Sequence, residues 1–189
     1  MIIAFNKPYG VISQFMPKEP GQRVLKEFKF PRENYPLGRL DMDSEGLLLL
    51  SDEKNWVDDF LHPRHRHKRT YHVQVDGQVT EAAVVKLSRG VMIQTRKTLP
   101  CEASLLIPPP DYPARIPPIR IRLAIPTSWL ELKLVEGKNR QVRRMTAAVG
   151  FPTLRLIRSA IGLFNLEGLS PGQWRILNSE ERLRLRGLV

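Results

Sequence analysis

The chain has 189 residues and a formal net charge of +11 at pH 7, from 30 Lys and Arg against 19 Asp and Glu. Such an excess of one charge favours a polyanionic partner, and nucleic acid is a better match than an anionic membrane surface. No segment approaches the roughly 20 consecutive apolar residues of a membrane helix, and the N-terminus lacks the pattern of a secretion signal. The single cysteine, Cys101, excludes an intrachain disulfide. We therefore expect a cytoplasmic protein with no membrane partner.

The first half of the chain predicts short strands joined by turns. Residues 2–5 form an apolar strand, and Pro8 and Gly10 follow where a tight turn prefers them. Residues 47–50 are a continuous leucine run, which predicts a strand buried on both faces. Residues 71–75 alternate between apolar and polar side chains, the pattern of a strand with one buried face.

The second half predicts helices as well as strands. Apolar alternation indicates strands at residues 119–125 and 130–134. Helices are predicted from Thr80 to Arg89, from Arg140 to Val149, and from about Asn178 onward. Six prolines between residues 108 and 118 exclude regular structure there and predict a stiff surface loop. The expected fold class is α+β, with a largely antiparallel sheet.

Residues 38–46, Gly-Arg-Leu-Asp-Met-Asp-Ser-Glu-Gly, form the first candidate site. Two glycines enclose a polar loop that leads into the leucine strand, a position where a rigid scaffold presents a side chain. Three interpretations remain open for carboxylates at 41, 43 and 45. They form a solvated acidic turn, a divalent-metal site, or one catalytic carboxylate whose neighbours shape the loop.

Basic residues dominate two further segments. Residues 136–145 begin a helix with clustered cations, which predicts either phosphate contacts or a solvated basic face. Residues 62–71 carry three histidines among cations, and the cations argue against zinc. Tyr71, where this segment enters a strand, is either a core aromatic or a platform that stacks on a base.

Five segments, taken in order, resemble one group of ribosomal pseudouridine synthases, which contains synthase A of the small ribosomal subunit together with synthases B, E and F of the large one. The opening motif is similar to residues 6–11, the signature loop to 38–50, and the tyrosine segment to 68–73. The basic motif is similar to residues 136–145 and the closing pattern to 161–172. The resemblance is strongest to the synthase E type, which acts on 23S rRNA and is a bare catalytic domain. It implies one catalytic domain over residues 1–189, made of two packed halves with an RNA cleft between them, and no N-terminal RNA-binding module.

The resemblance also implies roles for individual residues. Asp41 would be the essential carboxylate, Lys138 its cationic partner, and Tyr71 the residue that packs on the target base. Arg39 would fill the space of the flipped base, hold the neighbouring phosphate or brace the loop, and Leu40 and Val142 would line the pocket. The residues expected to contact RNA are Asn6, Lys7, Arg64, Arg66, Arg69, Arg140, Arg143, Arg144, Arg155 and Arg158.

The function expected from these observations is isomerisation of a specific uridine in ribosomal RNA to pseudouridine. The reaction adds no atoms and changes no oxidation state, so neither a cofactor nor a metal is expected. We also expect a monomer whose partner is large-subunit RNA. Two other functions fit parts of the sequence: a metal-dependent nuclease or phosphatase using the three carboxylates, and a non-catalytic RNA-binding or ribosome-assembly protein.

Overall fold

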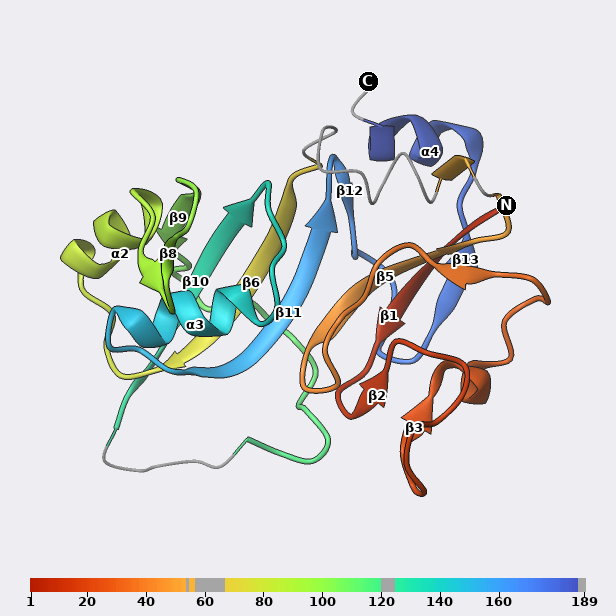
Figure 1. The fold of residues 1–189 in the computed structure, drawn as a ribbon, viewed down its shortest axis with the longest axis horizontal. Helices are drawn as coiled ribbons and strands as arrows, with labels where there is room; N and C mark the ends of the chain where they lie inside the picture. The colour runs from red at the N-terminus through yellow and green to blue at the C-terminus, as the bar shows by residue number, and fades with distance from the viewer. Residues whose placement is uncertain (54, 57–66, 120–124, 187–189) are drawn as a thin grey trace. The chain divides into compact units, whose positions relative to one another are not determined.

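The computed structural model describes residues 1–53, 55–56, 67–119 and 125–186 (Figure 1). The chain divides into two compact units. The first contains residues 1–67 and 158–189, and the second contains residues 68–157. The strand β11 (Thr153–Ile161) begins in the second unit and ends in the first.

An antiparallel sheet forms the framework of the first unit. Its central strands are β1 (Ile2–Lys7) and β5 (Glu45–Ser51), which pair in the register Ile3 to Leu50. β13 (Trp174–Ile176) pairs with the other edge of β1, β4 (Tyr35–Pro36) pairs with β5, and β12 (Phe164–Asn165) pairs with β11. Every residue of β5 is buried, which confirms the strand predicted from the leucine run.

Short elements complete the first unit. β2 (Val11–Ile12) pairs in parallel with β3 (Arg23–Val24), and the 3₁₀-helix η1 (Leu25–Phe28) follows. Aromatic rings pack on one face of the sheet, with the Phe5 and Phe28 ring centroids 4.7 Å apart. Such tilted aromatic pairs add to the stability gained from burying their area.

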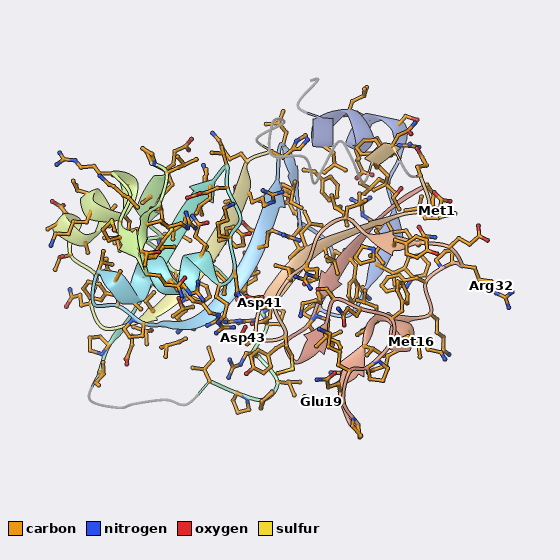
Figure 2. All side chains as sticks on the ribbon, in the orientation of Figure 1. Met1, Met16, Glu19, Arg32, Asp41 and Asp43 are labelled. Carbon is orange, nitrogen blue, oxygen red and sulfur yellow. The ribbon has the colours of Figure 1, made fainter. Side chains whose placement is uncertain are left out.

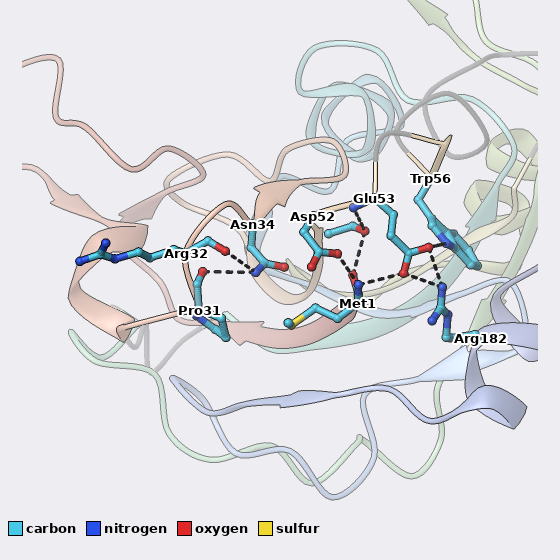
Figure 3. A network of polar contacts seen from close by, with 9 residues as sticks. Met1, Pro31, Arg32, Asn34, Asp52, Glu53, Trp56 and Arg182 are labelled. Carbon is cyan, nitrogen blue, oxygen red and sulfur yellow. Dashed lines mark hydrogen bonds and ion pairs between the residues drawn. The ribbon is translucent and has the colours of Figure 1, made fainter.

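The C-terminal helix of the first unit is connected to the start of the chain. This helix, α4 (Ser179–Arg186), begins where the sequence predicted it. Glu53 accepts hydrogen bonds from Arg182 Nη2 at 2.7 Å and from the Met1 amine at 2.8 Å (Figure 3). Asp52 also accepts a hydrogen bond from this amine. These carboxylates therefore link β1, the end of β5 and α4.

The second unit is a sheet with helices packed on one face. β10 (Thr127–Leu134) pairs antiparallel with β6 (Arg69–Asp76) and with β9 (Glu102–Leu105), and β7 (Met92–Ile93) pairs with β8 (Arg96–Lys97). Opposed residues of β6 and β10, such as Val73 and Leu130, form the core with buried residues of two helices. These helices are α2 (Glu81–Ser88) and α3 (Gln141–Ala148). The predicted alternation of β6 and β10 is confirmed.

The predicted limits of α2 are also confirmed. Thr80 is the N-cap, and its hydroxyl accepts a hydrogen bond from the Ala83 N–H at 3.3 Å. The predicted strand at 119–125 falls mostly on residues 120–124, which lie outside the described residues. The architecture, sheets with a few short helices, is the α+β class expected from the sequence.

The proline-rich segment is irregular between residues 108 and 118, as predicted. Tyr112 lies on the second unit, where its hydroxyl is 2.7 Å from His72 Nδ1 and its ring is 5.9 Å from that of Trp129. Burial lowers the pKa of His72, and the hydrogen bond and charge of Glu131 partly oppose this shift. This segment is therefore anchored by an aromatic side chain in its middle.

Across the described part of the chain, no helix has both the length and the apolar character that a membrane crossing requires.

Candidate active site

The loop between β4 and β5 carries Asp41 in the first unit. Hydrogen bonds fix the main chain of this loop at Leu40, Asp41 and Met42. Ser44 N donates to Asp41 O at 3.0 Å, and Gly10 N donates to Met42 O at 2.8 Å. The Ser13 hydroxyl donates to Leu40 O at 2.8 Å and accepts from Leu40 N at 3.0 Å. Figure 2 shows Asp41 and Asp43 on this loop, and the Asp41 residue is exposed. The loop therefore presents this carboxylate on a fixed backbone.

The two residues that precede Asp41 in the signature loop lie differently. Leu40 is buried and packs in the core of the first unit with Phe5 and Leu48. Arg39 is exposed. Leu40 thus anchors the loop in the core, while Arg39 and Asp41 are exposed on the surface.

Lys7 lies beneath this loop. Its side chain is fully buried, and its ammonium donates to Val11 O at 2.6 Å and to Pro8 O at 3.0 Å. Burial lowers the pKa of Lys7 to about 7, although the charges of Glu45, Asp43 and Asp41 act in the opposite direction. The sequence predicted a contact with RNA for Lys7. The fully buried side chain does not lie on the surface, and its two hydrogen bonds hold the turn at residues 8–11 instead.

Three more residues expected to contact RNA are also buried. Asn6 donates to Leu169 O at 2.7 Å, and Arg158 Nε donates to Leu47 O at 2.7 Å, both within the first unit. In the second unit, the Arg155 guanidinium lies over the Tyr112 ring at 5.7 Å. The sequence could not separate the internal cations Lys7, Arg155 and Arg158 from surface ones, because the local pattern around a Lys or Arg in a strand is the same in both cases.

Tyr71 lies on β6 in the second unit, where it is opposite Leu132 of β10. It is partly buried and packs against the core of that unit. Val142, expected in the pocket, is a buried member of the same core. One side of the Tyr71 residue is thus supported by the core, while part of it remains accessible.

The loop from β10 to α3 presents Lys138 in the second unit. Residues 137–140 are all exposed, whereas Gln141 is buried. Lys138 N donates to the Gln141 side-chain oxygen at 3.0 Å, and Gln141 N donates to Lys138 O at 3.1 Å. Both the N–H and the C=O of Lys138 are therefore hydrogen-bonded to Gln141.

The remaining predicted cations differ in their surroundings. Arg140 is exposed, while Arg69, Arg143 and Arg144 are partly buried. Arg143 donates to Thr153 O at 3.3 Å, and Arg144 donates to the Gln94 side chain at 2.8 Å. Arg64 and Arg66 lie outside the described residues.

Metal binding was one interpretation of the carboxylates at 41, 43 and 45. Over residues 1–53, 55–56, 67–119 and 125–186, no group of three His, Cys, Asp or Glu side chains is arranged to hold a metal ion. In the same loop Glu45 is buried beside the Lys7 charge rather than aligned with Asp41 on the surface.

Residues 1–148 match the model of the RNA pseudouridylate synthase family, and the chain belongs to this family. It is 48% identical over 177 residues to the ribosomal large subunit pseudouridine synthase E of Xanthomonas campestris, covering 93% of this chain and 95% of that protein. It is 47% identical over 174 residues to the synthase E of Vibrio vulnificus, covering 92% of this chain and 74% of the relative.

The fold gives the same classification. A crystal structure of a pseudouridylate synthase superposes with a TM-score of 0.79 at 26% identity, covering 97% of this chain and 73% of the other. The enzyme class predicted from the five sequence motifs, a pseudouridine synthase, is therefore confirmed.

Proposed function

We propose that this enzyme converts a uridine of large-subunit ribosomal RNA to pseudouridine, with Asp41 as the carboxylate that acts at the ribose. The similarity to synthases E, over nearly the whole of both chains in one case, is the observation that carries this proposal. The roles of individual residues rest on the motifs together with the surroundings of each side chain.

The reaction defines what the carboxylate has to do. The N1–C1′ bond of uridine breaks, the uracil turns, and C5 bonds to C1′; C5 then loses a proton and N1 gains one, so the product is an isomer of the substrate. Positive charge develops on the ribose as the glycosidic bond breaks, and an ionised carboxylate stabilises that charge or attacks C1′. An exposed Asp41 on a fixed loop supports this role, because a uridine turned out of its helix can be approached from the loop.

Lys138 and Tyr71 are proposed to act in the same reaction. Lys138 would supply positive charge, which favours the ionised form of a carboxylate. Tyr71 would stack on the detached uracil while it turns. If stacking is its whole contribution, Tyr71→Phe will be milder than Tyr71→Ala in turnover. A Tyr71→Phe enzyme as slow as Tyr71→Ala would instead assign a role to the hydroxyl, such as proton removal from C5.

RNA is proposed to bind through exposed and partly buried cations. The accessible members of the predicted set are Arg69, Arg140, Arg143 and Arg144. The buried Asn6, Lys7, Arg155 and Arg158 are assigned to internal support. We propose that the enzyme acts in the cytoplasm, since ribosomal RNA is the substrate, and that it acts as a monomer.

The carboxylate assignment is tested by a matched pair of substitutions. Asp41→Asn should abolish pseudouridine formation in a ribosomal RNA transcript, since the amide cannot stabilise the ribose cation. Binding of the RNA should persist. Asp43→Asn removes a charge from the same loop and should retain most of the activity. Turnover by a clean Asp41→Asn preparation would refute the assignment.

The substrate is tested by mapping pseudouridines in ribosomal RNA from cells with and without the protein. Loss of one large-subunit site is expected, and its return on expression of the wild-type chain but not of Asp41→Asn. A map that does not change, or a site lost only from small-subunit RNA, would contradict the proposed substrate.

A further inference from the structure

The loop that presents Lys138 is held by two residues that face inward. Glu136 precedes the exposed residues 137–140, and the buried Gln141 follows them. Arg140 lies between them in the left-handed region, with φ 52°. Few residues other than glycine adopt this conformation, and it persists where the surroundings fix it.

The Gln141 amide can point in only one direction. Its oxygen accepts from Lys138 N at 3.0 Å and from Arg96 Nη2 at 3.4 Å, whereas its nitrogen donates to Glu136 Oε1 at 2.6 Å. Exchanging oxygen and nitrogen would place donors against donors and the amide oxygen against a carboxylate. The side chain therefore sets the position of the Lys138 N–H.

Glu136 connects this arrangement to the neighbouring β-hairpin of β7 and β8. Its Oε1 also accepts from Leu99 N at 2.8 Å, and its Oε2 accepts from Arg96 Nη1 at 3.4 Å. Hydrogen bonds to a carboxylate are stronger than those between neutral groups. The loop is thus fixed to a distant part of the chain, and not only to the helix that follows it.

We infer that Gln141 and Glu136 are positioning residues that hold the Lys138 backbone for the reaction, an inference that rests on the role proposed for Lys138. A lysine side chain is long and flexible, so its ammonium is placed only as well as its backbone. A shift of about 1 Å in a reacting group costs on the order of 100-fold in rate. Neither residue needs to touch the RNA for its loss to slow the reaction.

The test uses single-turnover assays with enzyme in excess over a ribosomal RNA fragment. Gln141→Leu removes the side-chain bonds and should slow the reaction about 10- to 100-fold, while the Kd for RNA changes less than about threefold. Glu136→Gln keeps an oxygen for Leu99 N and Gln141 but loses its charge toward Arg96, so its effect should be smaller. Ser88→Ala is the control, because it removes an exposed hydrogen bond to Val85 O in the same unit and changes none of the residues 136–141, and its rate should equal that of wild type.

A double substitution separates positioning from general support of the fold. If Gln141 acts through Lys138, the double variant Gln141→Leu/Lys138→Met will be no slower than Lys138→Met alone. A double variant slowed by the product of the two single effects would overturn the inference. So would a wild-type rate in Gln141→Leu when Lys138→Met is slow. If Gln141→Leu does not fold, Glu136→Gln and its double variant with Lys138→Met decide the question in the same way.

Failure of the proposed function has a different signature. A wild-type enzyme that forms no pseudouridine would refute the function itself. A Lys138→Met enzyme with the wild-type rate, in an otherwise active protein, would remove Lys138 from the reaction and overturn the positioning inference with it.

Discussion

The Asp41 loop and the Lys138 loop are built in different ways, although each presents an exposed charge above buried polar groups. The Asp41 loop is fixed mainly through bonds to its main chain, two of them from the Ser13 hydroxyl, and the buried Lys7 ammonium lies close to its carboxylates. The Lys138 loop is fixed by the side chains of Gln141, Glu136 and Arg96. The first loop should therefore respond to changes in backbone conformation and pH, and the second to changes in side chains.

This difference has a physical cause. Main-chain bonds depend on φ and ψ, which any residue of suitable conformation can supply, so side-chain identity matters little within such a loop. Side-chain networks depend on each member, because removal of one partner leaves buried polar groups without a bond. Substitutions in the two loops and in the elements that support them should therefore have different effects.

Gly46→Ala should be the most damaging substitution in the first unit. Gly46 has φ +102°, and a Cβ there would lie 2.4 Å from the Arg158 carbonyl oxygen. Gly46 lies on β5 and Arg158 on β11, which are neighbours in the sheet and cannot easily move apart, so the free energy of unfolding should fall by more than about 3 kcal/mol. Gly10→Ala is the control, since its φ is +81° but no atom lies within 4 Å, and it should cost only about 1 kcal/mol. Equal losses in urea unfolding would contradict the close approach at Gly46.

Lys7→Met should change how stability depends on pH. The folded pKa of Lys7 is about 7 and its ordinary value is 10.5, so between these values the unfolded chain binds more protons than the folded one. The free energy of unfolding should therefore rise with pH in this window, by up to about 1.4 kcal/mol per unit from this group. Below pH 7 the cost of burying the charged form is present in full.

The measurement is urea unfolding of both proteins at pH 7 and pH 9. Lys7→Met lacks the group, so the difference between the two proteins should shift by about 2 kcal/mol in favour of wild type at the higher pH. Parallel stability curves for the two proteins would show that Lys7 does not titrate in this window.

Arg140→Gln should weaken RNA binding through the surface of the second unit. Arg140 is exposed, and loss of one phosphate contact should reduce the slope of log K against log salt by about 0.9 or less. Arg155→Met is the control, because the buried Arg155 lies over Tyr112 and its loss should leave the slope unchanged. A reduced slope in Arg155→Met but not in Arg140→Gln would reverse the assignment of surface and internal cations.

Thr80→Ala should have a smaller effect than any of these changes. It removes the hydroxyl that caps α2, at a cost of about 1 kcal/mol in stability. The single-turnover rate at a temperature where the protein is folded should not change, because the hydrogen bond that is lost lies within the first turn of α2. A slower reaction in the folded protein would show that the Lys138 loop depends on more than its own network.

Local patterns in the sequence were enough to find many of the elements. Alternation and the leucine run located β5, β6 and β10, and the Thr80 cap and apolar stripe located α2 and α3, because these signals depend on neighbours a few residues apart. The motif order identified the enzyme class. It also selected Asp41 and Lys138, which the structure places on the surface, although their roles remain proposals.

The division of the cations into internal and surface ones came from tertiary packing. Lys7 and Arg158 are buried beside backbone carbonyls, whereas Arg140 is exposed, and nothing in their local sequence separates them. The bracing of Lys138 by Gln141, Glu136 and Arg96 was also missed, because Arg96 lies 40 residues before Glu136. The one local signal was an acidic residue and a glutamine on either side of exposed basic positions. Burial and long-range bonding depend on how distant segments pack, and a local pattern carries no record of that.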